Sequence, residues 1–104
     1  MTDGTERMAK MNHTTIKYDR LPAHMQDGAR LYVEHGVPPG GFLAAVLSNN
    51  MMDAFARADS VNAAAMKEWT MWMHNDAPRG CWGSQSIVED WVDRGGLGRE
   101  VSHD

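Results

Sequence analysis

The stretch "SVNAAAMKEWTMWMHNDA", residues 60–77, decides the fold class that this sequence predicts. Its apolar residues recur three and four positions apart, which places them on one face of a helix. The members of this stripe are Val61, Ala65, Met66, Trp69, Trp72 and Met73. The pattern predicts one long helix that begins at Asp59 or Ser60, ends before Pro78 and buries its tryptophans in a core.

The stretch "LPAHMQDGARLYVEHG", residues 21–36, predicts an earlier helix over 22–35. Pro22 suits the first helical turn, where its missing N–H costs nothing, and Gly36 is well placed to stop the helix. Gly28 lowers helix stability relative to alanine. Because it lies beside the apolar face, we expect it to permit close packing against another helix.

Two short helices are expected next, in "VPPGGFLAAVLSNN", residues 37–50, and "MMDAFARAD", residues 51–59. The first is apolar all round, which is typical of a helix buried on most sides. Asn50 is expected to cap the second, in which Met51, Met52 and Phe55 should pack. The pair Gly40-Gly41 lacks a following Lys-Ser/Thr, so a structural role is favoured over a phosphate loop.

The last helix is expected in "QSIVEDWVDR", residues 85–94, with two alternatives for its start. Either Ser84 caps it, or Ser86 and Glu89 form a capping box. The chain is therefore predicted to be all-α, a compact bundle of about five short helices over residues 21–97. A flexible N-terminal arm over residues 1–20 and a C-terminal tail over residues 98–104 are expected around it.

Composition excludes several classes of protein. The chain has 104 residues and a formal net charge of −4, so we expect one domain and no binding to a DNA or RNA backbone. No apolar stretch suits a bilayer or a signal peptide, and the single cysteine fits a reducing cytosol. Nine methionines and four tryptophans leave more apolar surface than five short helices hide, which favours a homo-oligomer.

The sequence gives little indication of a catalytic site or of a metal-binding site. No two histidines lie four positions apart on one expected helix and no second cysteine is present, so we predict neither a metal site nor a cofactor. Cys81, with His74 and Asp76 upstream, is conceivable as a nucleophile. A buried structural cysteine is the simpler interpretation, and we predict no enzyme.

The turn "HNDAPRGCWGSQS", residues 74–86, holds the densest chemistry. Trp82 either plugs the end of the bundle or offers a stacking face to a base. Arg79 can contact a phosphate, and helix starts at Ser84 and Gly40 offer N–H groups to an anion. The predicted ligand-binding residues for a nucleotide-sized molecule are Arg79, Trp82, Ser84, His74 and Asn75.

Three stretches together carry a resemblance. Residues 21–50, "AFARAD" at 54–59 and "HNDAPRGCWGS" at 74–84 resemble a group of small accessory proteins of tailed bacteriophages and prophages, over roughly residues 21–97. No activity is established for that group, so no catalytic residue carries over. The resemblance implies a phage accessory protein that acts by binding in the host cytoplasm.

Several roles fit that implication. The leading one is a sponge that counters host defence by sequestering a nucleotide immune signal. The alternatives are an anti-CRISPR-like inhibitor that binds a host defence protein, a phage structural or regulatory factor without a ligand, and a small enzyme that uses Cys81.

Overall fold

The computed structural model describes residues 16–98, which contain helices and no strand. The helices that lie wholly within this range are α2 (Ala23–His35), α3 (Gly41–Leu47), α4 (Met51–Arg57), α5 (Ser60–Ala64), α6 (Met66–Asn75) and α7 (Gln85–Arg94). The predicted all-α fold is confirmed for this part of the chain. The predictions made for residues 1–15 and 99–104 lie outside the described residues.

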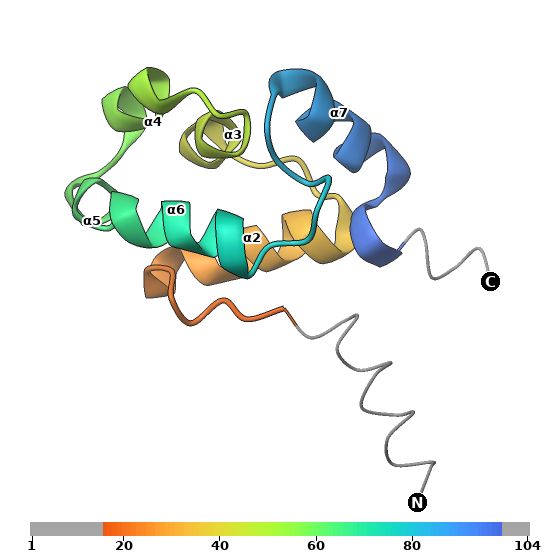
Figure 1. Ribbon diagram of the computed structural model, residues 1–104, viewed down its shortest axis with the longest axis horizontal. Helices are drawn as coiled ribbons and strands as arrows, with labels where there is room; N and C mark the ends of the chain where they lie inside the picture. Colours follow the sequence, from red (N-terminus) through yellow and green to blue (C-terminus); the bar gives the residue numbers. More distant parts are fainter. Residues whose placement is uncertain (1–15, 99–104) are drawn as a thin grey trace, which may run out of the picture.

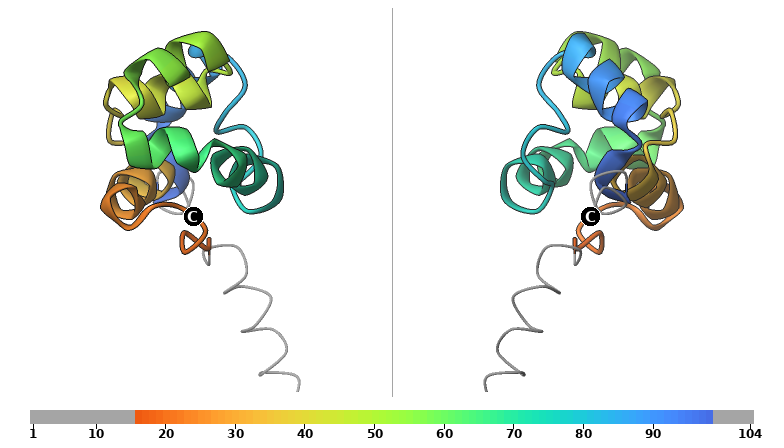
Figure 2. Two further views of the ribbon diagram at one scale, coloured as in Figure 1. Left: turned by 90° about the vertical axis from the view of Figure 1, so that its left-hand side faces the viewer. Right: turned by 90° about the vertical axis from the view of Figure 1, so that its right-hand side faces the viewer.

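The helices form two layers around one core. In Figure 1, α2 and α6 lie along the lower side of the molecule, and α3, α4 and α7 lie above them; the end-on views of Figure 2 show the same arrangement. Both layers contribute fully buried side chains, the largest being Trp69, Trp72, Trp91, Tyr32 and Leu47. Three of the four tryptophans are therefore buried within one chain, so their number gives little reason to expect an oligomer.

The long helix expected over residues 60–77 is wrong, because the chain breaks it at Ala65. The N–H of Ala65 bonds to the carbonyls of both Val61 and Asn62, and α6 starts afresh at Met66. Asn62 is buried and its amide oxygen accepts a hydrogen bond from Nε1 of Trp69 at 3.2 Å. A buried indole N–H needs such a partner. Val61, expected in the apolar stripe, is instead 53% exposed.

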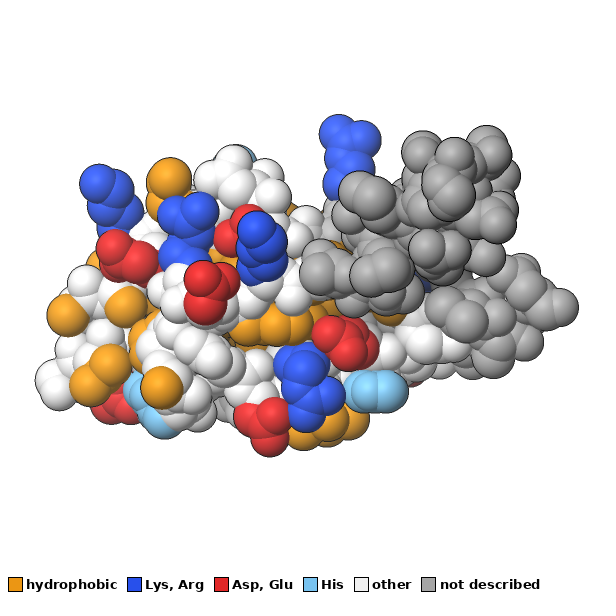
Figure 3. All heavy atoms as spheres, turned by 90° about the horizontal axis from the view of Figure 1, so that it is seen from below, with side chains coloured by type: hydrophobic (Ala, Val, Ile, Leu, Met, Phe, Trp, Pro, Cys, Tyr) orange, Lys and Arg blue, Asp and Glu red, His pale blue; other side chains and the backbone are white. Residues whose placement is uncertain are grey.

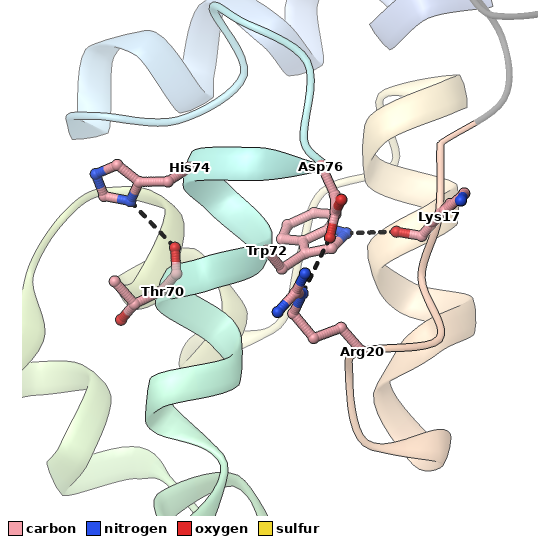
Figure 4. A network of polar contacts seen from close by, with 6 residues as sticks. All are labelled: Lys17, Arg20, Thr70, Trp72, His74 and Asp76. Carbon is pink, nitrogen blue, oxygen red and sulfur yellow. Dashed lines mark hydrogen bonds and ion pairs between the residues drawn. The ribbon is translucent and has the colours of Figure 1, made fainter.

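Residues 16–20 lie against the helices. The sequence predicts them to belong to the flexible N-terminal arm, so this part of the prediction is wrong. The indole N–H of Trp72 donates to the carbonyl oxygen of Lys17 at 2.8 Å. Arg20 forms an ion pair with Asp76 at 3.2 Å, close to the end of α6 (Figure 4). The segment is therefore held to α6 at two points.

Helix α4 packs differently from the prediction. Ala54 is its fully buried residue and Met51 is half-buried, whereas Met52 and Phe55 are 85% and 52% exposed. A helix of only two turns presents one narrow face to the core, and here the small Ala54 occupies that face. The predicted cap at its start is confirmed, because the Asn50 side chain accepts from the N–H of Asp53.

The start of α7 resolves the two alternatives in favour of Ser84. Its Oγ accepts a hydrogen bond from the N–H of Ile87 at 3.2 Å, and the helix begins at Gln85. The hydroxyl of Ser86 lies 3.2 Å from that of Ser84 and makes no cap of its own among the described residues.

We expect Ser84→Ala to lower the free energy of unfolding by about 1 kcal/mol, because the cap is lost. Ser86→Ala is the matched control and should change the stability by less than about 0.5 kcal/mol. Urea denaturation followed by circular dichroism measures both. Equal losses in the two variants would contradict the assignment of the cap to Ser84.

Candidate functional site

The turn between α6 and α7 is anchored in the core by its main chain and by Cys81. The hydroxyl of Tyr32 donates to the carbonyl oxygen of Cys81 at 2.7 Å, and the N–H of Gly83 donates to the carbonyl oxygen of Leu47 at 2.8 Å. Cys81 is fully buried, whereas Trp82 is only half-buried. Cys81 therefore lies within the core, and Trp82 packs against the core while keeping part of its ring exposed.

The turn carries the five predicted ligand-binding residues, His74, Asn75, Arg79, Trp82 and Ser84. The structure brings the rings of His74 and Trp82 together, with centroids 5.1 Å apart. Nδ1 of His74 lies 3.1 Å from the carbonyl oxygen of Thr70 (Figure 4). Asn75 and Arg79 are exposed and have no partner among the described residues, while the Ser84 hydroxyl is occupied by its cap. The described surface has two grooves, one beside α2 and the start of α3 and one between α3, α4 and α7. None of the five residues lines either groove.

Burial makes Cys81 a poor nucleophile. Desolvation raises the pKa of its thiol from 9.0 to about 12, and the thiolate is the reactive form.

We expect Ellman's reagent to leave Cys81 unmodified at pH 8 in the folded protein and to modify it fully in urea. Because the folded-state pKa is raised, the thiol stabilises the fold below about pH 9, and this contribution is lost as the pH rises from about 9 toward 12. Rapid modification of the folded chain would contradict the burial of this thiol.

A first groove, with a volume of about 360 Å³, lies between α2, residues 37–41, the start of α3 and the α4–α5 connection. Its larger apolar lining residues are Met25, Leu31, Val37, Pro38, Pro39, Phe42 and Leu43. Its polar lining residues are His24, Arg57, Asp59 and Asn62. The groove therefore joins an apolar wall to a small set of charged and polar groups, as ligand sites do.

Asp59 is held in place by two partners. One carboxylate oxygen accepts from the N–H of Asn62 at 2.7 Å, which caps α5, and the other lies 3.0 Å from Nε2 of His24. The backbone hydrogen bond from Asn62, and then the hydrogen bond with His24, lower the pKa of this carboxyl. The group is thus ionised and oriented at neutral pH, and able to accept hydrogen bonds from a ligand.

Arg57 has two close neighbours, the carboxylate of Asp53 and the main chain at Gly41. Its Nε donates to Asp53 at 2.9 Å, one turn earlier on α4. NH1 of Arg57 lies beside Gly41, where a Cβ atom would be only 2.9 Å from this end of the flexible side chain. Both terminal nitrogens of Arg57 lack a partner among residues 16–98 and are available to a ligand.

Gly28 lies in the middle of α2, and the expectation that it permits close helix packing is wrong. A Cβ atom at this position would have no atom within 4 Å, because Gly28 faces the groove. A mid-helix glycine costs about 1 kcal/mol relative to alanine. No packing contact offsets that cost, and the open space beside Gly28 belongs to the groove.

A second groove, of about 380 Å³, lies between α3, α4 and α7. It shares Pro39, Gly41 and Arg57 with the first. Its other polar lining residues are Ser48, Asn50, Asp53, Gln85 and Glu89. The two grooves therefore adjoin each other on either side of Arg57.

Surface charge, metal ligands and helix length indicate no further candidate site among the described residues. Acidic and basic side chains are interspersed when the molecule is seen from below (Figure 3). Among residues 16–98, no three His, Cys, Asp or Glu side chains are placed to hold a metal ion. No helix in the same range combines the length and apolar character needed to cross a membrane.

The sequence does not reveal this groove, although several of its residues stand out there for other reasons. The sequence predicts a packing role for Gly28, a structural role for the pair Gly40-Gly41, and only a helix start at Asp59. One feature of the sequence does point to the groove. Gly28 lies in the middle of a predicted helix, where it lowers helix stability and caps no helix end.

Comparisons with known protein families, with curated proteins and with solved structures found no match to this chain. The resemblance to phage accessory proteins stays a prediction, and the first groove is the candidate functional site.

Proposed function

We propose that this chain is a small binding protein that holds a nucleotide in the first groove. The observation that supports this proposal is the placement of three kinds of group around one space of about 360 Å³. These are an apolar wall, a fixed carboxylate at Asp59 and a guanidinium with free terminal nitrogens at Arg57. A nucleotide offers a base, sugar hydroxyls and a phosphate to match them.

The apolar wall suits a flat base. Phe42 is half-buried, and its ring is held edge-on to Trp69 with centroids 5.4 Å apart. The rings of Pro38 and Pro39 add rigid apolar surface beside it. Stacking of a base on an aromatic side chain contributes about 1–3 kcal/mol.

The polar groups suit the sugar and the phosphate. An ionised carboxylate accepts hydrogen bonds from sugar hydroxyls, as Asp59 is oriented to do. The planar guanidinium of Arg57 matches the geometry of phosphate oxygens. Because Arg57 is 56% exposed, its contribution should weaken as salt is added.

Isothermal titration calorimetry with AMP, GMP, CMP and UMP at low ionic strength tests this proposal. We expect Arg57→Gln to weaken binding about 10- to 100-fold, which is the usual range for a lost hydrogen bond to a charged group. The matched control is Lys67→Gln, which removes an exposed charge on α6 that has no partner among the described residues. It should bind as the parent chain does.

Asp59→Asn separates the sugar contact from the fold, because asparagine also caps a helix. We expect this variant to lose the preference of the parent chain for ribonucleotides over 2′-deoxyribonucleotides. Absence of binding to all four nucleotides, or equal affinities of Arg57→Gln and Lys67→Gln, would contradict the proposal.

In the phage setting that the resemblance implies, the protein would sequester a nucleotide immune signal in the host cytoplasm. The ligand would be returned unchanged on denaturation, because binding alone is proposed. Native mass spectrometry of the purified chain tests this role and the predicted homo-oligomer together.

A second candidate function is inhibition of a host defence protein, as anti-CRISPR-like proteins do. The observation that favours it is the exposure of Met52 and Phe55, which are three positions apart and so share one face of α4. Methionine and aromatic residues are enriched in protein interfaces relative to the rest of the surface. A Met52→Ser/Phe55→Ser variant should then lose its protein partner while its nucleotide affinity stays the same.

A further inference from the structure

We propose that the ligand is a dinucleotide whose linking phosphate binds at Arg57, with one nucleoside in each groove. This inference rests on the proposed function and names the class of nucleotide. The two grooves have similar volumes, about 360 Å³ and about 380 Å³, and they share three lining residues. A mononucleotide in the first groove would leave the second unused.

The charge at the boundary fits a single linking phosphate. Arg57 is the only arginine or lysine that lines either groove within the described part of the chain. Its Nε donates to Asp53, and its NH1 lies beside Gly41. The guanidinium is therefore held at the boundary, where it can reach a phosphate that joins two nucleosides.

The second groove suits a nucleoside rather than another phosphate. Asp53 and Glu89 line it with carboxylates, and Glu89 accepts from the Gln85 side chain at 3.0 Å. Carboxylate oxygens repel phosphate and accept hydrogen bonds from base amino groups and sugar hydroxyls. Ala44, Ala45 and Val88 supply apolar surface for the base.

The test compares AMP with the dinucleoside monophosphate ApA and with its cyclic counterpart, by calorimetry on the full chain. We expect ApA to bind about tenfold or more tightly than AMP, because the second nucleoside adds apolar contacts and hydrogen bonds of its own in the second groove. The cyclic compound carries a second phosphate, so it shows whether the site tolerates further negative charge.

Two variants block the second groove from opposite walls. Gln85→Trp on α7 and Ala44→Leu on α3 should each bind AMP as the parent chain does and lose the advantage of ApA. The matched control is Asp90→Trp, an exposed position of α7 that does not line the groove. It should keep the advantage of ApA.

The outcomes separate this inference from the proposed function. Equal binding of AMP and ApA by the parent chain would overturn the dinucleotide and leave the mononucleotide proposal standing. An advantage of ApA that survives in both blocked variants would also overturn it. If neither compound binds, the proposed function fails and the inference fails with it.

Discussion

Trp69→Ala is expected to lower the free energy of unfolding by about 3–5 kcal/mol, the usual cost of removing a large aromatic residue from a core. Trp69 is fully buried, and its ring lies edge-on to both Phe42 and Trp72. Its indole N–H is also the partner of the buried Asn62 amide. The substitution therefore leaves both a cavity and an unpaired polar group.

Urea denaturation monitored by circular dichroism measures this loss. A domain of this size has a total stability of about 5–15 kcal/mol, so the loss is a large share of the total and the urea midpoint should fall markedly. Trp82→Ala is the matched control, because that ring is only half-buried on the turn. A larger loss for Trp82→Ala than for Trp69→Ala would show that the core is centred elsewhere.

Gly28→Leu is expected to abolish nucleotide binding and to leave the fold intact. The new side chain has open space, because nothing lies within 4 Å of a Cβ atom at this position. That space is the first groove, which the leucine would fill. Leucine is also a better helix former than glycine, so stability should rise by up to about 1 kcal/mol.

Two further substitutions in α2 check this interpretation. Gly28→Ala adds one methyl group and should weaken binding less than leucine does. Ala23→Leu enlarges an exposed residue of α2 that does not line the groove, so it should bind normally. A Gly28→Leu variant that is stable and binds nucleotides with unchanged affinity would exclude this groove as the site.

Local signals in the sequence predicted some of the helix ends. The Asn50 cap acts within one helical turn, the left-handed Gly36 stops α2, and Ser84, one of the two alternatives for the start of α7, caps that helix. The break at Ala65 could not be predicted in this way. It accompanies a contact between Trp69 and Asn62, and periodicity alone does not report such a contact.

The candidate site was harder to predict, because its groups come from separate elements. Gly28 lies on α2, Arg57 ends α4 and Asp59 precedes α5, and no spacing rule connects them. The turn over residues 74–86 predicts a binding site instead, because its polar and aromatic side chains lie close together in the sequence. The structure uses part of that chemistry, Cys81 and the main chain of Gly83, to anchor the turn in the core.

The most direct test of the central claim is a titration of the ¹⁵N-labelled chain with AMP and with ApA, followed by NMR. A nucleotide in the first groove should shift the backbone amides of Gly28, Gly40 and Gly41 and leave the indole N–H of Trp82 unchanged. Shifts confined to Trp82 and the glycines of the turn would place the ligand at the turn instead. A spectrum unchanged at millimolar nucleotide would contradict nucleotide binding by this chain.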